Sequence, residues 1–202
     1  MNTITVPCAG SFEETGAFTR FTLEQVPWPD AYPYKPDVSV AIAHSDSSVL
    51  LRFEVSEKNA RAVTLESNGP VWEDSCVEFF VKAPGSEQYF NFETNCIGTG
   101  LAAKRRSRSD FEHFGAGKME QVVRRSSLPH APLDLRDAVW SLELEVPFAL
   151  LDCGPRPGRL LANFYKCGDK TAVPHFVSWN PVLTPAPDFH RPEFFGTLEL
   201  LW

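Results

Sequence analysis

Two acidic side chains are predicted to face each other across a β-hairpin near the middle of the chain. Residues 76–82 and 89–95 read as two strands joined by a Pro-Gly turn. A simple antiparallel register places Glu78 opposite Glu93, with Asn91 on the same face, because successive side chains of a strand alternate between faces. Carboxylates and amides form hydrogen bonds with hydroxyl groups, so this face has the chemistry to bind a polyhydroxylated ligand.

The opposition of two carboxylates needs an explanation, because like charges directly opposite each other destabilise a sheet by a few tenths to about 1 kcal/mol. A neighbouring Arg or Lys, a bound cation, protonation of one carboxyl, or a neutral ligand that donates hydroxyls to both would offset it. The plain alternative is a solvated face on which both side chains diverge into water. Trp72, just ahead of the first strand, favours a ligand, since a tryptophan is costly to expose without use.

A basic side chain is expected to reach the acidic pair from the next strand. If a turn follows 89–95, the strand 99–105 returns beside it and brings Arg105 to the face that carries Glu93. Arg105 would then neutralise the pair and could bind a hydroxyl bidentately. Arg108 is the reserve candidate for the same role.

The elements that must position these residues read as short β-strands. Seventeen prolines, sixteen phenylalanines and alternating runs separated by turn residues are typical of an antiparallel β-sandwich or barrel. We predict an all-β, jelly-roll-like antiparallel β-sandwich with few short helical turns, one of them within 147–152, and an irregular segment over 107–138. Besides the acidic hairpin, strands are predicted at 38–43, 49–55, 99–105, 140–147, 160–166 and 194–201.

Length and charge limit the class of protein. At 202 residues and 43% hydrophobic, the chain can bury one adequate core, so we expect a single domain over 1–202. The formal charge of −7 argues against nucleic acid as a partner, because neutralising phosphates takes a surplus of Lys and Arg. The one basic run, 104–108, is short enough to be a solvated edge.

Cysteine content and hydropathy bear on the compartment. Five cysteines without CxxC spacing indicate neither a zinc ribbon nor a complete disulfide framework, so free or buried thiols are expected. No stretch approaches the ~20 apolar residues of a membrane span, so a membrane is not expected as a partner. No signal peptide is visible, and the protein is expected to be cytoplasmic if Met1 is the native start and otherwise periplasmic or secreted.

Two separated motifs resemble those of family 9 carbohydrate-binding modules. The first is VWEDSCVEFFVKAP followed by YFNFETNCIGTG, and the second is FVSWNPVLTPAPDFHRPEFFGTLEL near the C-terminus. With the hairpin at 38–55, the resemblance spans most of the chain. It implies non-catalytic binding of a mono- or oligosaccharide in a β-sandwich. Such modules are usually appended to secreted glycosidases, which connects them with bacterial polysaccharide utilisation and carbohydrate catabolism.

The resemblance also implies how a sugar would be held. Trp72 falls in the first motif and Trp179 in the second, and the two are expected to stack on the apolar faces of a pyranose, while charged and amide groups bind its edges. Trp28, flanked by prolines, competes with them for ligand contact, and His190 is expected to hold the loop before the last strand. The residues expected to bind sugar are Trp72, Trp179, Glu78, Asn91, Glu93 and Arg105.

Calcium is the one cofactor that the resemblance suggests, as a structural ion. Family 9 modules commonly carry it, and Asp74 and Asp46 are the candidate ligands here. Ser75 stands where the family often has a second acidic residue, and Cys76 beside it is unusual. The sequence therefore assigns no metal site.

A glycoside hydrolase and a haem-binding sandwich are the alternatives. Glycosidases use two carboxylates about 5–5.5 Å or about 6.5–9.5 Å apart, and opposed Glu78 and Glu93 could meet the shorter separation. A shallow face with Arg105 nearby is expected to keep both ionised, which disfavours general acid catalysis, so no catalytic residue is predicted. A haem would need Met or His ligands, and the chain has only Met1 and Met119 and no CxxCH.

Overall fold

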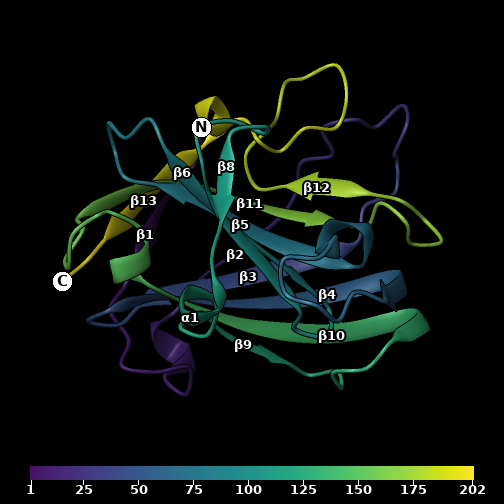
Figure 1. Ribbon diagram of the computed structural model, residues 1–202, viewed down its shortest axis with the longest axis horizontal. Coiled ribbons are helices and arrows are strands. Elements are labelled where there is room, and N and C mark those ends of the chain that lie inside the picture. The colour runs from purple at the N-terminus through teal and green to yellow at the C-terminus, as the bar shows by residue number, and fades with distance from the viewer.

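The computed structural model describes residues 1–202 and shows two β-sheets stacked on each other (Figure 1). The larger sheet contains β1 (Thr3–Val6), β5 (Cys76–Lys82), β6 (Tyr89–Asn95), β7 (Gly100–Arg105), β8 (Phe111–His113), β11 (Arg159–Cys167), β12 (Phe176–Ser178) and β13 (Gly196–Leu200). The smaller sheet contains β2 (Thr19–Thr22), β3 (Asp37–His44), β4 (Ser48–Ala62), β9 (Val123–Ser126) and β10 (Leu133–Pro147). The helical segments are α1 (Ala116–Met119) and the 3₁₀ turns η1 (Thr15–Ala17), η2 (Val71–Glu73), η3 (Phe148–Leu150) and η4 (Pro192–Phe194).

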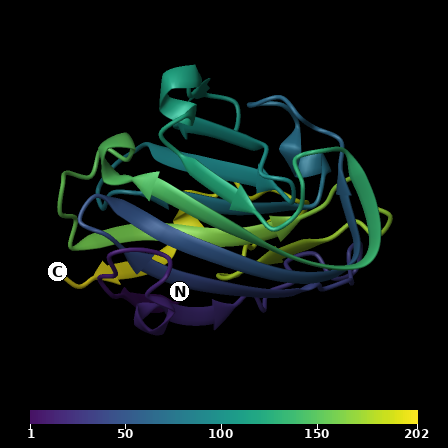
Figure 2. The same ribbon diagram turned by 90° about the horizontal axis from the view of Figure 1, so that it is seen from below.

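The strand order confirms the predicted antiparallel β-sandwich. The larger sheet runs β1-β13-β11-β5-β6-β7-β8, with β12 paired to β11, and the smaller runs β2-β3-β4-β10-β9. Only β1 and β13 pair in parallel within these ladders. In Figure 2 the strands of the smaller sheet cross in front of the larger one. None of the helical segments has the length and hydrophobicity that a membrane crossing requires.

The segment predicted to be irregular, 107–138, is partly ordered, so that prediction is wrong. It contains β8, α1 and β9, and β10 begins at Leu133 rather than at 140. β8 and β9 are short edge strands that carry little alternation of their own, and they form because β7 and β10 offer them partners. The short helical turn expected within 147–152 is η3.

The acidic hairpin has the predicted register. Glu78 pairs with Glu93, and β7 returns with Arg105 opposite Tyr89. The inner face of these strands contributes Phe79 and Phe92 to a core of 38 buried residues between the sheets. The other face carries both carboxylates, as the alternation requires.

The outer face of the larger sheet is also covered, and this differs from the solvated face that the sequence left open. A second apolar cluster of 12 buried residues packs on it. Phe189, from the long segment between β12 and β13, stacks on Tyr165 of β11 at 4.1 Å between ring centroids. Trp28 packs against Phe189, and its indole N–H donates to the Thr184 carbonyl at 2.8 Å. The covering segment is thus fixed to the sheet below it.

The turn that carries Trp72 is fixed by a buried carboxylate. Asp74, fully buried, accepts hydrogen bonds from the Arg61 guanidinium at 2.6 Å, from Asn95 Nδ2 at 3.0 Å and from the backbone N–H groups of Val63 and Thr64. These donors come from β4, from the residues after it and from β6. One side chain therefore sets the position of η2 relative to both sheets.

A buried ionic contact ties β4 to β11 behind the covered face. Lys166 Nζ lies 2.9 Å from Glu57 Oε2, and Trp140 Nε1 donates to Glu57 Oε1 at 2.7 Å. Lys166 also reaches His175 Nε2 at 2.6 Å. Burial and the Lys166 charge lower the pKa of His175 to about 2, so this histidine is neutral and accepts the hydrogen bond.

We expect Glu57→Gln to destabilise the protein by about 3–5 kcal/mol, because it leaves the Lys166 ammonium buried without its carboxylate. Urea unfolding measures the change in the free energy of unfolding. Glu54→Gln, on the same strand but exposed to solvent, is the control and should shift it by less than about 0.5 kcal/mol. Equal, small effects of the two substitutions would show that the buried ion pair stabilises the protein no more than the exposed one.

Candidate functional site

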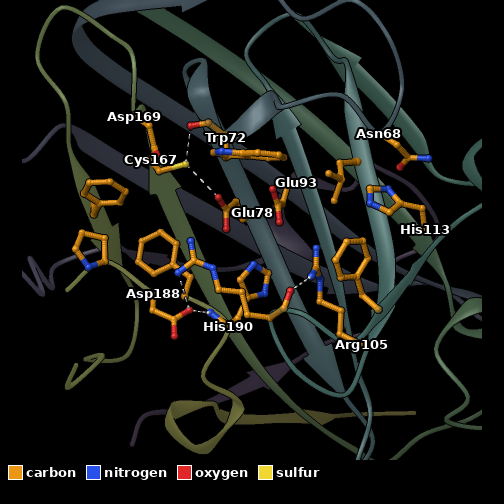
Figure 3. A pocket seen from close by; sticks show the side chains of 16 residues that line it. Asn68, Trp72, Glu78, Glu93, Arg105, His113, Cys167, Asp169, Asp188 and His190 are labelled. Carbon is orange, nitrogen blue, oxygen red and sulfur yellow. Dashed lines mark hydrogen bonds and ion pairs between the residues drawn. The ribbon is translucent and has the colours of Figure 1, made fainter. Parts of the chain in front are cut away.

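A cleft of about 360 Å³ opens on the outer face of the larger sheet (Figure 3). Its floor is formed by β5, β6, β7 and β11, which contribute Glu78, Glu93, Leu101 and Cys167. The walls come from segments that are distant in sequence: η2, β8, β12 and the residues before η4. The volume lies within the usual range for small-molecule sites, roughly 300–1,000 Å³.

Trp72 forms one wall of the cleft. Its side chain is exposed to 39% and lies beside the two floor carboxylates, where Figure 3 shows its ring edge-on. The Trp72 carbonyl accepts a hydrogen bond from the Asp169 amide at 3.3 Å and lies 3.5 Å from the Cys167 sulfur. These contacts fix the Trp72 backbone at the edge of the cleft, and the partly exposed indole is accessible to a ligand.

The acidic pair is buried and makes no ion pair. Glu78 is 3% exposed and Glu93 is 4% exposed, and neither has a basic side chain within salt-bridge distance. Glu78 accepts from the Cys167 thiol at 3.1 Å, and Glu93 accepts from Asn91 Nδ2 at 2.8 Å. The solvated alternative is therefore wrong for both carboxyls.

Burial changes the protonation of this pair. It raises the pKa of Glu93 to about 7, and burial together with the Glu93 charge raises the pKa of Glu78 well above its usual range. The expectation that Arg105 keeps both carboxylates ionised is wrong, because desolvation outweighs the attraction of the arginine. Near neutral pH the pair holds a proton, so it can both donate and accept hydrogen bonds.

Arg105 lies on the predicted face but does not contact the carboxylates. Its Nε donates to Asn91 Oδ1 at 2.7 Å, one terminal nitrogen donates to the Arg108 carbonyl at 2.9 Å, and its guanidinium lies 4.2 Å from the centre of the Phe111 ring. Asn91 is fully buried and therefore connects Arg105 to Glu93 from beneath the cleft surface. Asn91 positions its neighbours rather than facing a ligand.

Trp179 lies outside the cleft, which corrects its expected role as a second stacking residue. It is 5% exposed and packs against Phe21 and Phe164, at 5.4 and 5.5 Å between ring centroids, in the core between the sheets. Ser178 pairs with Tyr165, whose side chain points outward, so the next residue points inward. Trp28 is also buried and supports the covering segment instead of lining the cleft.

Several cleft residues were missed by sequence reasoning. They include Phe111 and His113 of β8, Phe176 of β12, and Asp188, Phe189 and His190 of the covering segment. The motif DFHRPE is the one signal that marked part of this set. His190 has the structural role that was expected, because its Nδ1 lies 3.1 Å from the Tyr89 hydroxyl, but it also lines the cleft.

The residues suggested for calcium do not fit that ion. Calcium takes six to eight oxygen ligands. The Asp74 oxygens are occupied by hydrogen bonds from Arg61, Asn95 and backbone amides, and Asp46 lies exposed in the turn between β3 and β4. The side chains able to hold a metal gather in one place only, and two of the three are sulfurs. For haem, Met119 is buried in the core and Met1 is exposed, so neither lines the cleft.

Comparison with known proteins gives consistent results. A family model described as carbohydrate-binding family 9 matches residues 13–200. The crystal structure of a protein from Bacteroides uniformis, whose proposed role is carbohydrate binding, has a TM-score of 0.92 and 36% identity and covers 98% of this chain and 99% of that one. No curated protein matches the sequence significantly.

More distant structures share the fold. A family 9 carbohydrate-binding module from Caldicellulosiruptor kristjanssonii, in complex with cellotriose, has a TM-score of 0.64 at 11% identity and covers 98% of this chain and 93% of that one. In complex with glucose the corresponding structure has a TM-score of 0.62 at 11% identity, covering 99% and 96% of the two chains. At this identity the likeness concerns the β-sandwich alone.

The half-buried histidine of the cleft, His190, predicts a loss of stability in acid. Burial, with the charges of Arg105 and Arg108, lowers the pKa of His190 to about 3 from the ordinary 6.5. Between these values the unfolded chain binds a proton that the folded protein does not, so the free energy of unfolding falls as the pH falls through this window. Between pH 7 and pH 5, one such group lowers the free energy of unfolding by up to about 2 kcal/mol.

We expect His190→Gln to reduce this pH dependence, measured by urea unfolding at both pH values. His130→Gln, at an exposed position, is the control and should leave the dependence unchanged. A His190→Gln protein as acid-sensitive as the unsubstituted one would mean that His190 is protonated equally in the folded and unfolded states.

Proposed function

The chain belongs to carbohydrate-binding family 9, and from this premise we propose that its cleft binds a mono- or oligosaccharide without cleaving it. The observation that carries the proposal is the placement of a partly exposed tryptophan, Trp72, beside two buried carboxyls, Glu78 and Glu93, in one cleft. A pyranose has apolar C–H faces and hydroxyl edges. The cleft offers an aromatic surface for the first and hydrogen-bonding groups for the second.

The protonation of the acidic pair suits a ligand made of hydroxyl groups. A hydroxyl is both donor and acceptor, an ionised carboxylate only accepts, and a protonated carboxyl can also donate. A buried pair that holds one proton therefore matches hydroxyls in either orientation. Asn91 Nδ2 donates to Glu93 Oε1 at 2.8 Å, and Arg105 Nε donates to Asn91 Oδ1 at 2.7 Å. These two hydrogen bonds hold Glu93 in position.

The comparisons support sugar as the ligand class. The relative from Bacteroides uniformis, at 36% identity, has a proposed carbohydrate-binding role. The family 9 module from Caldicellulosiruptor kristjanssonii is described in complex with cellotriose and with glucose. Glucose and short gluco-oligosaccharides are therefore the first ligands to test on this chain.

Hydrolysis of the bound sugar is the second function to test. The raised pKa values of Glu78 and Glu93 meet one requirement of a general acid, which the sequence argument had assumed to be unmet. Family membership favours binding alone. Incubating the protein with each sugar that binds and measuring released reducing ends separates the two, because a binding module releases none.

Trp72→Ala should weaken sugar binding about tenfold or more, since a stacked aromatic contributes on the order of 1–2 kcal/mol through contact and desolvation. Isothermal titration with glucose and gluco-oligosaccharides measures the dissociation constant. Trp202→Ala is a matched control, because Trp202 is exposed to a similar 44% but lies away from the cleft. Unchanged affinity in Trp72→Ala, for a sugar that binds the unsubstituted protein, would place the binding site elsewhere.

Glu78→Gln should weaken binding by about 1 kcal/mol or more, because a fixed amide replaces a carboxyl that can either donate or accept through the proton it shares with Glu93. Without sugar the same substitution removes a buried carboxyl whose raised pKa costs stability at neutral pH, so the free energy of unfolding should hold steady or rise. Titration and urea unfolding on one preparation measure both quantities. Lost stability with unchanged affinity would make Glu78 a structural residue instead.

A further inference from the structure

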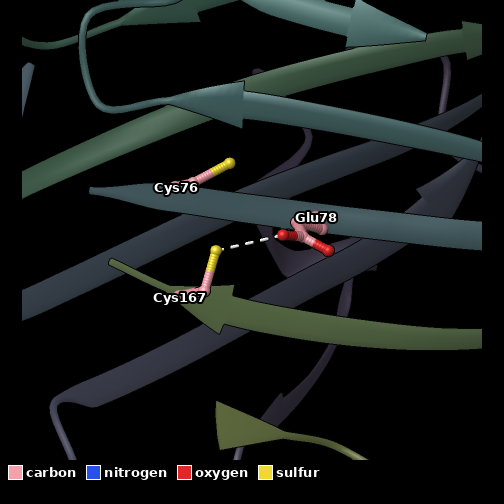
Figure 4. Close-up of side chains that lie close together, drawn as sticks. All are labelled: Cys76, Glu78 and Cys167. Atoms are coloured by element: carbon pink, nitrogen blue, oxygen red, sulfur yellow. Dashed lines mark hydrogen bonds between the residues drawn. The ribbon is translucent and has the colours of Figure 1, made fainter. Parts of the chain in front are cut away.

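Two cysteines and a glutamate form a cluster at the floor of the cleft, where Glu78 and Cys167 line the cleft and Cys76 lies buried beside them (Figure 4). Cys76 of β5 and Cys167 of β11 are paired directly across the sheet, and Glu78 follows two residues along β5 on the same face. The two sulfurs and a carboxylate oxygen all lie within 4.8 Å of one another, and Cys167 Sγ is 3.1 Å from Glu78 Oε1. No other group of three such side chains in the protein is this close.

No basic side chain forms a hydrogen bond or an ion pair with the cluster, although Arg105 and Arg108 line the same cleft. Glu78 and Glu93 are buried without an ion pair, and Asp169 also lines the cleft. The nearest buried lysine, Lys166, is committed to Glu57 on the inner face, and Arg105 is committed to Asn91. A cation at the cluster would therefore meet buried carboxyls that no ion pair of the protein neutralises.

We propose that Cys76, Cys167 and Glu78 bind a divalent cation of the zinc class, with the fourth coordination position open to the cleft. Two thiolates and a carboxylate are ligands that zinc accepts, and three protein ligands with one open position form a known zinc arrangement. Bond lengths of about 2.3 Å to sulfur and about 2.1 Å to oxygen place tetrahedral ligand atoms about 3.6–3.8 Å apart. The observed spacing brackets this value, so small side-chain rotations suffice.

The donor set discriminates between metals. Calcium and magnesium prefer oxygen ligands, whereas thiolates select zinc and related borderline or soft ions. Binding one divalent ion releases one proton from each thiol to solvent. Glu78 binds as the carboxylate, and the proton that the acidic pair holds then lies on Glu93. Because the metal replaces the thiol protons, its affinity should rise with pH.

Cobalt(II) is the probe that reports the ligands directly, because thiolate-bound cobalt gives a charge-transfer absorption in the near ultraviolet. We expect the reduced protein to show this band at one equivalent of cobalt, and zinc to displace it. Calcium in excess should leave it unchanged. No band in the folded protein, or calcium displacing cobalt as well as zinc does, would overturn the proposal.

Cysteine substitutions assign the band to the cluster. Cys76→Ser and Cys167→Ser should each abolish it and weaken zinc affinity by at least about 100-fold, since even residues that only support a ligand are worth about 10–100-fold. The control is the Cys8→Ser/Cys153→Ser double variant, whose cysteines lie outside the cluster and which should keep the band. A band that persists in Cys76→Ser, or disappears in the control, would place the metal elsewhere.

A third variant keeps the test decisive if the cysteine variants fail to fold. Glu78→Gln retains both thiols, so the charge-transfer band should remain while zinc affinity falls by about tenfold or more. Unchanged zinc affinity would exclude Glu78 as a ligand. Sugar titrations in the presence of a chelator measure sugar binding without the metal, so failure of one activity is distinguishable from failure of the other.

Discussion

Burial of the outer face of the larger sheet is the constraint on which the cleft depends. An antiparallel sheet can leave one face in water, and its polar residues are then unremarkable. Here Phe189, Trp28 and their neighbours cover that face, so polar side chains beneath them lose their hydration. Each must find a partner or change its protonation, since an unpaired buried charge is costly. The chain Arg105–Asn91–Glu93 and the contact between Tyr89 and His190 are such partnerships.

The cover itself has to be held in place from several sides. Trp28 ties it to the N-terminal region through the Thr184 carbonyl, and Tyr165 donates its hydroxyl to the Phe189 carbonyl at 3.2 Å. Asp74 fixes the opposite wall, where Trp72 lies, and Lys166 anchors β11 from the inner side. Because these contacts involve β4, β6 and β11, the walls of the cleft are fixed to both sheets of the sandwich. A rigid cleft spends little conformational entropy on binding.

The sequence was sufficient for relationships that depend on strand periodicity. Glu78 opposite Glu93, and Arg105 on their face, follow from a hairpin turn and a period of two, which leave little freedom. The inward direction of Trp179 could not be derived, because it depends on how β12 pairs with β11, a long-range contact. Likewise, alternation assigns a face to a residue but does not say whether another segment covers that face. For this reason the sequence could not place Phe111, Phe189 and His190 in the cleft.

The hydrogen bonds of Arg105 determine the charge state of the acidic pair in the cleft. Had the arginine reached Glu78 or Glu93, the pair would be two ionised acceptors with their charges already neutralised. Its hydrogen bonds go instead to Asn91 and the Arg108 carbonyl, and the pair must take a proton or a cation from outside the protein. Without a ligand, the two carboxyls therefore lack an ion-pair partner that would stabilise them. A ligand that donates hydrogen bonds or carries positive charge supplies the missing interaction. The same unpaired carboxyls that lower the stability of the protein therefore make the cleft selective for such ligands.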